Sequence, residues 1–323
     1  MSVQDKHWAS VKAMNFLAGM RIMLWIFRVF GRVPFRIVLY PVLFWYVLTR
    51  KAPRQASLDF LNRVNSSVNP DTGLKIQLRS GVLGVLKHFA SFAETMLDKM
   101  LLWSGQFTLA SIDFFGREQL DQCVAEKRGA ILVCSHLGNL ELTRVLSRGR
   151  EAIKITVLAH TKHAQAFSKM LEDLDPDSQL NMLAVTEITP ATAMLLNDKI
   201  AQGEFIVITG DRIPVAANPR VAISDFLGAP AAFPIGPYVL ASILQCPIYL
   251  LFTTQRNKHY EVHFELMSDS IRLPRKGRDQ ILAGLVAQYA ARLEYHCLRA
   301  PLQWFNFFDF WHLPQQDTSD APR

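Results

Sequence analysis

Cysteine is scarce in this chain of 323 residues, which contains only four. They are widely separated and form no CxxC pair: Cys123, Cys134, Cys246 and Cys297. This spacing argues against a disulfide scaffold, a structural zinc module and a thioredoxin-like centre, and it favours a reducing compartment. Glycine and proline are limited to 16 each, which excludes a collagen-like or low-complexity chain. Because half of the residues are apolar and a fifth are charged, we expect a folded protein with a full core.

Acidic residues are almost absent from the first 50 positions, where Asp5 is the only one against seven lysines and arginines. The rest of the chain is nearly neutral, with 28 basic and 27 acidic side chains. The net charge of +7 therefore belongs to one segment, which disfavours nucleic-acid binding as its explanation. The same 50 residues hold three of the six tryptophans. Arginine interleaved with tryptophan and short apolar runs is typical of a segment at a membrane interface.

Long apolar runs are missing as well. The longest uncharged stretch of the first segment, Ile37–Leu48, has 12 residues, whereas a transmembrane helix needs about 20. The stretch Met14–Phe30 is interrupted by Arg21 and Arg28. We therefore expect residues 1–50 to form an N-terminal helical membrane anchor, either monotopic or single-pass. A buried helical hairpin of a soluble domain is disfavoured, because its arginines would need partners that the segment lacks. A cleaved signal peptide is not indicated.

Beyond the anchor, the pattern predicts an α/β domain over residues 51–314 and a polar tail over 315–323. Short apolar runs are typical of buried strands, and apolar spacings of three and four are typical of helices. The expected strands are Gly129–Cys134, Ile153–Ala159, Phe205–Thr209, Pro247–Thr253 and, as an edge strand, His259–Phe264. The expected helices are 72–103, Leu140–Leu146, Ala191–Ala201, Pro234–Leu244 and Arg278–Arg299, with a short helix in the connector Lys51–Val68. This alternation predicts a mixed, mostly parallel central sheet flanked by helices.

The first candidate for chemistry is the segment Ser135–Glu141, directly after the first expected strand. Loops at the carboxyl ends of parallel strands line ligand crevices in α/β folds. Five helical steps would put His136 and Glu141 on different faces, so we expect His136 in the turn and Glu141 in the first helical turn, with Asn139 as N-cap. The Glu141 carboxylate is expected to hold Nδ1 of the imidazole and to leave Nε2 as a general base. By spacing alone, a structural role for this pair is the alternative.

The His-x4-Glu spacing at a strand exit resembles the first motif of the lysophospholipid acyltransferase superfamily, in the form found in its lipid A late acyltransferase branch. Other segments occur in the matching order between residues 15 and 312: Thr209–Pro214, Phe226–Pro230, Phe233–Pro237, Cys246–Tyr249 and Pro301–Phe305. The N-terminal anchor also fits that branch. The block at 226–237 lacks the arginine that glycerolipid acyltransferases use for a glycerol phosphate, which argues against such an acceptor.

The resemblance implies transfer of an acyl chain from a thioester, on acyl-carrier protein or coenzyme A, to a hydroxyl of a lipid or glycolipid. It places the reaction at the cytoplasmic face of the bacterial inner membrane, without a metal or a separate cofactor. His136 would be the base and Glu141 its orienter, helix N-terminal amides near Asn139 would stabilise the oxyanion, and no acyl-enzyme would form. A lipid ester hydrolase that uses the same pair and a noncatalytic lipid-binding protein are the alternatives.

Further candidate site residues follow other expected elements. Asp211 and Arg212 come after the third expected strand, so we expect them to face the His136 crevice, with Asp211 bonded to Arg212. Arg212 would then hold a phosphate of the donor or acceptor, the alternative being a turn-stabilising ion pair. Arg144 is a weaker phosphate candidate. Gly228 and Gly236 are expected to shape the backbone near the acyl chain or simply to allow sharp turns.

Three other patterns have plainer explanations. Histidine pairs within 160–163 and 259–263 have metal-ligand spacings but no obvious third ligand, so no metal site is expected. The basic run Arg272–Arg278 is interpreted either as a solvated loop or as a docking patch for acyl-carrier protein or lipid. The aromatic cluster Trp304–Trp311 is expected to pack on the domain or at the membrane interface.

Overall fold

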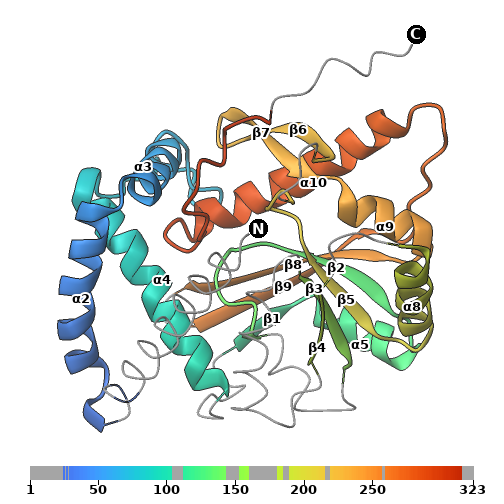
Figure 1. The fold of residues 1–323 in the computed structure, drawn as a ribbon, viewed down its shortest axis with the longest axis horizontal. Coiled ribbons are helices and arrows are strands. Elements are labelled where there is room, and N and C mark those ends of the chain that lie inside the picture. The colour runs from blue at the N-terminus through green and yellow to red at the C-terminus, as the bar shows by residue number, and fades with distance from the viewer. Residues whose placement is uncertain are drawn as a thin grey trace, which may run out of the picture.

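The computed structural model describes residues 25, 27, 29–103, 112–142, 153–159, 180–184, 189–214, 219–256 and 259–314. The helices are α2 (Arg32–Thr49), α3 (Lys51–Asn65), α4 (Gly81–Trp103), α5 (Arg117–Ala125), α8 (Pro190–Ala201), α9 (Gly236–Leu244) and α10 (Arg278–Arg299). The strands are β1 (Ile112–Phe115), β2 (Ala130–Cys134), β3 (Ile155–Ala159), β4 (Leu180–Ala184), β5 (Phe205–Thr209), β6 (Val221–Phe226), β7 (Ala229–Pro234), β8 (Ile248–Arg256) and β9 (His259–Ser268). Figure 1 shows α2, α3 and α4 at one end of the molecule and α8 and α9 at the other, with the sheet between them.

The central sheet has seven strands in the order β1-β9-β8-β2-β5-β3-β4. All neighbouring pairs are parallel except β8 and β9, so the mixed, mostly parallel sheet predicted from the sequence is confirmed. β2 lies in the middle of the sheet and is buried along its whole length, as its unbroken apolar run requires. β6 and β7 form a separate antiparallel hairpin that packs on α10.

The edge position expected for His259–Phe264 is wrong, because β1 pairs with β9 and covers it. The alternating pattern misled the prediction for a physical reason. The polar side chains of Glu261, His263 and Glu265 do not face water but lie against α10, where Arg292, Arg299 and His296 bind them. Alternation normally marks a solvated face, and here the face is covered by a helix of complementary charge.

The sequence also missed the β6–β7 hairpin. Its second strand contains Pro230 and Pro234, and proline lowers the strand propensity of a segment because it lacks the N–H that a ladder needs. The two-stranded hairpin tolerates them because it lies outside the central sheet. α9 accordingly begins at Gly236 rather than at Pro234. The strand β1, the helix α5 and the strand β4 were not predicted either.

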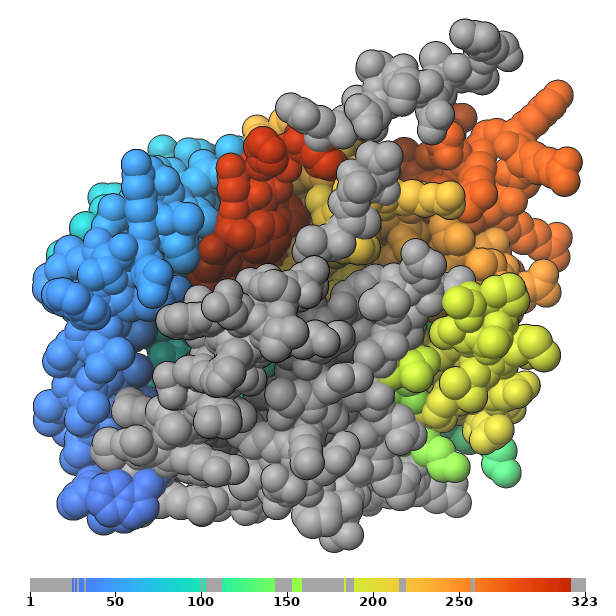
Figure 2. All heavy atoms as spheres, in the orientation of Figure 1, coloured from blue at the N-terminus to red at the C-terminus, as the bar shows by residue number. Residues whose placement is uncertain are grey.

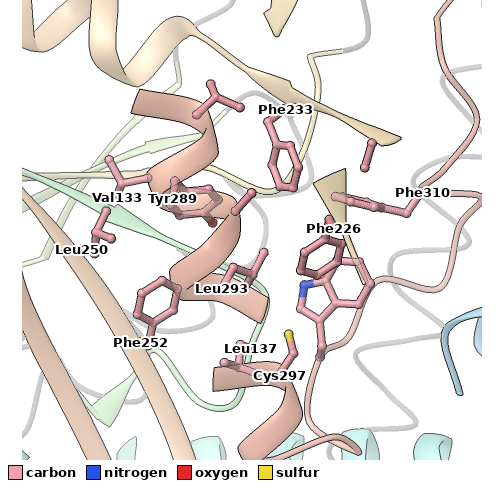
Figure 3. Close-up of a cluster of buried hydrophobic side chains, with 14 of the residues drawn as sticks. Val133, Leu137, Phe226, Phe233, Leu250, Phe252, Tyr289, Leu293, Cys297 and Phe310 are labelled. Carbon is pink, nitrogen blue, oxygen red and sulfur yellow. The ribbon is translucent and has the colours of Figure 1, made fainter. Parts of the chain in front are cut away.

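The main core lies between β2, α10 and the hairpin (Figure 3). Tyr289 and Leu293 of α10 pack beside Phe226 and Phe233 of the hairpin, and Phe310 joins them from the C-terminal segment. The Tyr289 hydroxyl donates to the carbonyl oxygen of Cys134 at 3.0 Å. This bond ties α10 to the residue that ends β2, immediately before the expected catalytic turn.

The N-terminal helices pack against each other through α4. Phe35 and Leu39 of α2 join Leu97 and Leu101 of α4 in one buried cluster, and Arg36 forms an ion pair with Glu94 of α4 at 2.6 Å. Within the described residues no single helix is long and apolar enough to cross a membrane. By length and composition alone, α2 and α3 together could do so as a pair bent by 97°.

Some predicted features lie outside the described residues. The first part of the expected anchor, up to residue 24, and most of the expected helix Leu140–Leu146 are among them, as is the polar tail 315–323. The expected helix 72–103 is confirmed from Gly81 onward, whereas residues 72–80 are irregular.

Candidate active site

His136 and Asp211 are brought together by the register of two neighbouring strands. β2 and β5 are parallel, with Cys134 opposite Thr209 at their carboxyl ends. Each of the two residues comes two positions after the end of its strand, so they meet at the same edge of the sheet. Such an edge is where open α/β sheets place their ligand sites.

The two side chains form a hydrogen-bonded pair. Nδ1 of His136 lies 2.8 Å from Oδ1 of Asp211, and the backbone N–H of His136 donates to Oδ2 at 2.7 Å. Asp211 is completely buried, while the His136 side chain is 27% exposed. Within the described residues Nε2 has no hydrogen-bond partner, so the second ring nitrogen is available to a substrate.

The ionised form of Asp211 is favoured despite its burial. Burial alone raises the pKa of a carboxyl group, but the charge of His136 and its two hydrogen bonds outweigh this, and the pKa of Asp211 lies below its usual value. A buried carboxylate on Nδ1 fixes the tautomer that carries the lone pair on Nε2.

This geometry corrects the expected role of Glu141, because the carboxylate on Nδ1 belongs to Asp211. Asn139 does begin the turn, and its Oδ1 accepts the backbone N–H of Glu141 at 3.1 Å, as an N-cap residue would. Glu141 is half-buried there and faces the charge of Lys99 on α4. Burial lowers the pKa of Lys99, and the negative charge of Glu141 opposes this shift. The sequence analysis missed Lys99, which the helical pattern of α4 alone does not distinguish from a surface lysine.

Gly138 makes the turn possible. Its φ is +64°, and a Cβ built there would lie 1.9 Å from the backbone oxygen of Thr253 on β8. Glycine alone tolerates both conditions. The turn therefore packs directly against Thr253 of β8, the strand beside β2.

The C-terminal segment 301–311, here called the strap, crosses this turn. The N–H of Gly138 donates to the carbonyl of Gln303, and the N–H of Phe305 donates to the carbonyl of His136, both at 2.8 Å. Trp304 donates its indole N–H to Oδ2 of Asp211 at 3.0 Å. Asn306 donates to the same oxygen at 3.1 Å. The aromatic cluster Trp304–Trp311 was expected to pack on the domain or at the membrane interface, and its contact with Asp211 had no signal in the sequence beyond its aromatic density.

Arg212 does not form the bond with Asp211 that the sequence analysis expected. No ion pair joins the two in the described part of the chain. Instead Nε of Arg212 donates to Oδ1 of Asn306 at 3.1 Å, and Nη2 approaches the carbonyl of Phe305 at 3.4 Å. The guanidinium group also lies 5.9 Å from the ring centre of Phe308. Arg212 is thus held beside the strap at the same sheet edge as His136.

The remaining predicted site residues are Arg144, Gly228 and Gly236. Arg144 lies outside the described residues. Gly228 occupies the turn of the β6–β7 hairpin with a φ of +75°, which explains the glycine, and Gly236 begins α9. No hydrogen bond joins either glycine to His136 or Asp211 among the residues that the structure describes.

The histidine patterns do not resolve into a simple metal site. The pair at 160–163 lies outside the described residues. His263 lies near Glu265 and His296, and the possible ligand atoms of these three residues are within 4.8 Å of one another. However, Arg292 donates to both carboxylate oxygens of Glu265, at 2.7 and 2.8 Å. Oε1 of Glu265 also lies 2.9 Å from Nε2 of His296, so in the described structure this carboxylate belongs to an ion-pair network with α10.

The basic run Arg272–Arg278 lies away from His136. It connects the end of β9 with the start of α10, and β9 runs antiparallel to β8. Its position is therefore at the sheet edge opposite to the carboxyl ends of β2 and β5. As a docking patch it would not face the candidate active site.

A family model described as bacterial lipid A biosynthesis acyltransferase matches residues 85–312. The match begins within α4 and ends just after the strap, so it includes His136, Asp211 and Asn306. It is shorter at the N-terminal side than the resemblance from residue 15 suggested. A search of curated proteins found no match for this chain.

Proposed function

We propose a reaction for this chain from one premise: it belongs to the bacterial lipid A biosynthesis acyltransferase family, and it is an acyltransferase of lipid biosynthesis. In the proposed reaction it transfers an acyl chain from a thioester of acyl-carrier protein or coenzyme A to a hydroxyl of a lipid or glycolipid. The observation that carries the mechanism is the 2.8 Å contact between His136 Nδ1 and Asp211.

In the proposed mechanism His136 is the general base. Its Nε2 accepts the proton of the acceptor hydroxyl while the hydroxyl oxygen attacks the thioester carbonyl. The new C–O bond forms, the C–S bond breaks, and the imidazolium returns the proton to the departing thiolate. Asp211 stabilises the imidazolium electrostatically and keeps the ring in the required tautomer.

Direct transfer without an acyl-enzyme is supported by the state of Ser135. This residue precedes His136, and its Oγ is buried without a hydrogen-bond partner in the described structure. A serine nucleophile needs an adjacent base to take its proton. Ser135 lacks that activation, whereas an incoming hydroxyl has Nε2 available.

Asn139 and the turn that it begins are proposed to bind the thioester carbonyl. Nδ2 of Asn139 is buried and has no hydrogen-bond partner among the described residues. An orphan donor next to the base is suited to a negative charge that develops only during the reaction. Glu141 is proposed to have a different role, in which its negative charge balances the charge of Lys99 at the margin of the site.

Arg212 is proposed to hold a phosphate, either of the pantetheine arm of the donor or of the acceptor headgroup. Its guanidinium group is anchored through Nε and Nη2 to the strap. Guanidinium groups bind phosphates through paired N–H donors, and the anchoring orients the group before a ligand arrives.

The location at a membrane is a proposal that α2 supports. Its outer face carries exposed apolar side chains: Val33 (68%), Ile37 (67%), Val42 (60%) and Trp45 (70%). The only charged side chain between Val33 and Thr49 is Arg36, and it is paired with Glu94 of α4. Figure 2 shows α2 in blue along one side of the molecule. We propose that this face enters the cytoplasmic leaflet of the bacterial inner membrane as a monotopic surface, because its opposite face is occupied by α4.

The proposed function is tested by mass spectrometry of lipids after incubation of the full-length protein with palmitoyl-coenzyme A and vesicles of a bacterial lipid extract. Transfer predicts a lipid product that gains one acyl group, which is absent with His136→Ala. Release of free fatty acid in place of that product would identify a hydrolase. An undiminished product with a folded His136→Ala variant would refute the assignment of the base.

A further inference from the structure

We propose that Asn306 is a positioning residue that keeps the Asp211 carboxylate on His136 by standing between that carboxylate and Arg212. The inference rests on the proposed function, in which His136 and Asp211 act together. It goes beyond that function because it assigns a role to a residue that touches neither the base nor the reacting atoms.

The need for such a residue follows from the charges at the site. Asp211 is buried, and the next residue along the chain is an arginine. A carboxylate and a guanidinium group prefer to pair directly and bidentately, and the preference increases away from water. If Asp211 paired with Arg212, its oxygens would be drawn away from His136. The described structure contains no such pair.

Asn306 occupies the place of that ion pair. Its Nδ2 donates to Oδ2 of Asp211 at 3.1 Å, and its Oδ1 accepts Nε of Arg212 at 3.1 Å. An amide is suited to this position because it carries a donor and an acceptor on one rigid group. Aspartate would place a second negative charge against Asp211, and leucine would satisfy neither neighbour. The side chain is 2% exposed, so water does not replace these bonds.

The strap fixes Asn306 relative to the imidazole. Phe305, its neighbour, donates its N–H to the carbonyl of His136 at 2.8 Å. Trp304 donates its indole N–H to the same Asp211 oxygen that Asn306 contacts. Nε2 of His88 on α4 lies 2.9 Å from the carbonyl oxygen of Trp304. Asn306 and His136 are therefore held together by a connected set of backbone and side-chain contacts.

The first test is spectroscopic and needs no substrate. A proton on Nδ1 that is bonded to a carboxylate gives a low-field NMR resonance, which is assigned in the full-length protein by its loss in His136→Gln. Asn306→Leu is expected to abolish this resonance, because Arg212 then pairs with Asp211. The double variant Asn306→Leu with Arg212→Met is expected to regain it, since the competing cation is gone. A purely structural role of Asn306 predicts no such rescue.

The matched control is Asn65→Leu. Asn65 is a half-buried asparagine whose amide, like that of Asn306, both donates and accepts: its Nδ2 donates to the carbonyl of Leu78 and its Oδ1 accepts the Leu78 N–H. This variant is expected to keep the resonance. Retention of the resonance in Asn306→Leu would overturn the proposal, as would a folded double variant that fails to regain it.

The second test separates kcat from KM, with palmitoyl-coenzyme A and vesicles of bacterial lipid extract. Asn306→Leu is expected to lower kcat by about 100-fold, a part of the roughly 10⁴-fold loss seen when a catalytic histidine loses its carboxylate partner. The kcat of the double variant is expected to be about tenfold higher than that of Asn306→Leu, while its KM stays raised because Arg212 is absent. If Asn306→Leu has the wild-type kcat and His136→Ala is inactive, the inference about Asn306 is overturned and the proposed function is not. An active His136→Ala overturns the proposed function instead.

Discussion

At the residue scale, the site depends on one buried carboxylate. Asp211 accepts four hydrogen bonds, from Nδ1 and the backbone N–H of His136, from Trp304 and from Asn306. A buried charge with fewer partners would cost several kcal/mol. The donors are therefore part of the reason that the carboxylate stays ionised and stays in place. Removing its charge alone, with its shape kept, is the most direct test of this arrangement.

Asp211→Asn is expected to lower kcat by about 10³- to 10⁴-fold while the protein remains folded, because an amide allows the wrong imidazole tautomer. The measurement is the initial rate of acyl transfer at saturating thioester, with near-UV circular dichroism as the check of the fold. Asp225→Asn removes an exposed carboxylate on β6 and should leave the rate unchanged. A rate for Asp211→Asn within tenfold of the wild type would contradict the assigned pair.

Gly138→Ala is expected to lower the free energy of unfolding by more than about 2 kcal/mol, because a left-handed φ and a clash with the Thr253 carbonyl add together. Denaturant unfolding measures the change. Gly228→Ala is the matched control, since its φ is also positive, at +75°, but nothing lies within 4 Å of the added Cβ. It should cost about 1 kcal/mol. Equal losses in the two variants would show that the contact with β8 contributes nothing.

At the element scale, α4 connects the proposed membrane face to the candidate active site. One side of the helix packs against α2 through Leu97 and Leu101, while Lys99 faces the charges of Glu141 and Arg212. A further α4 residue, His88, contacts both α3 and the strap through Ser57 and the Trp304 carbonyl. The position of the strap on Asp211 therefore depends on helices that lie far from it in sequence.

As the pH falls, the contacts of His88 with α3 and the strap should weaken at pH values above those at which most carboxylates are protonated. Burial lowers the pKa of His88 to about 4, below its ordinary value of 6.5. Its contribution to stability is complete above pH 6.5 and is lost as the pH falls toward 4, because the unfolded chain binds a proton that the folded chain does not. The full loss from this group is about 3 kcal/mol. Unfolding by urea at several pH values measures it. His88→Gln should flatten the dependence, and His259→Gln, which removes an exposed imidazole, should not.

The exposed face of α2 predicts binding to lipid. Trp45→Gln should weaken association with anionic vesicles by at least about tenfold, because a buried indole contributes roughly 2 kcal/mol. Co-sedimentation with vesicles measures it. Met194→Gln changes an equally exposed apolar side chain, 71% against 70% exposed, on α8 at the other end of the molecule. That control should bind like the wild type. Equal losses for both variants would argue against α2 as the lipid-facing surface.

At the scale of the whole molecule, the proposed chemistry and the proposed membrane contact belong to different surfaces, which α4 joins. This separation predicts that their defects can be told apart. With an acceptor dispersed in detergent micelles, Trp45→Gln should regain the wild-type rate, because the protein no longer has to find a bilayer. Asp211→Asn should stay impaired in micelles and in vesicles alike. A Trp45→Gln variant that is equally slow in micelles would place Trp45 in the catalytic machinery instead.

Several parts of this arrangement follow from local signals in the sequence. α10 runs from Arg278 to Arg299 as predicted, since its apolar spacing is regular over its whole length. β2 and β5 are predicted by short apolar runs, and the turn at His136 by its glycine and its N-cap asparagine. The partner of His136 was mistaken because local spacing favours Glu141, which is near in sequence. His136 and Asp211 each come two positions after the end of their strand, which could have indicated that they meet. Using this observation requires knowing that β2 and β5 are neighbours in the sheet.

The sequence by itself predicted the family, most strands of the central sheet, α10 and His136 as the proposed base, because apolar periodicity and a histidine at a strand exit are properties of short segments. Only the tertiary structure decided which carboxylate holds that base and what keeps the carboxylate there. Strand order sets Asp211 opposite His136, and the strap brings Trp304 and Asn306 to it from nearly 100 residues away. Contacts of that separation depend on how the whole chain closes around its core, and no local pattern encodes them.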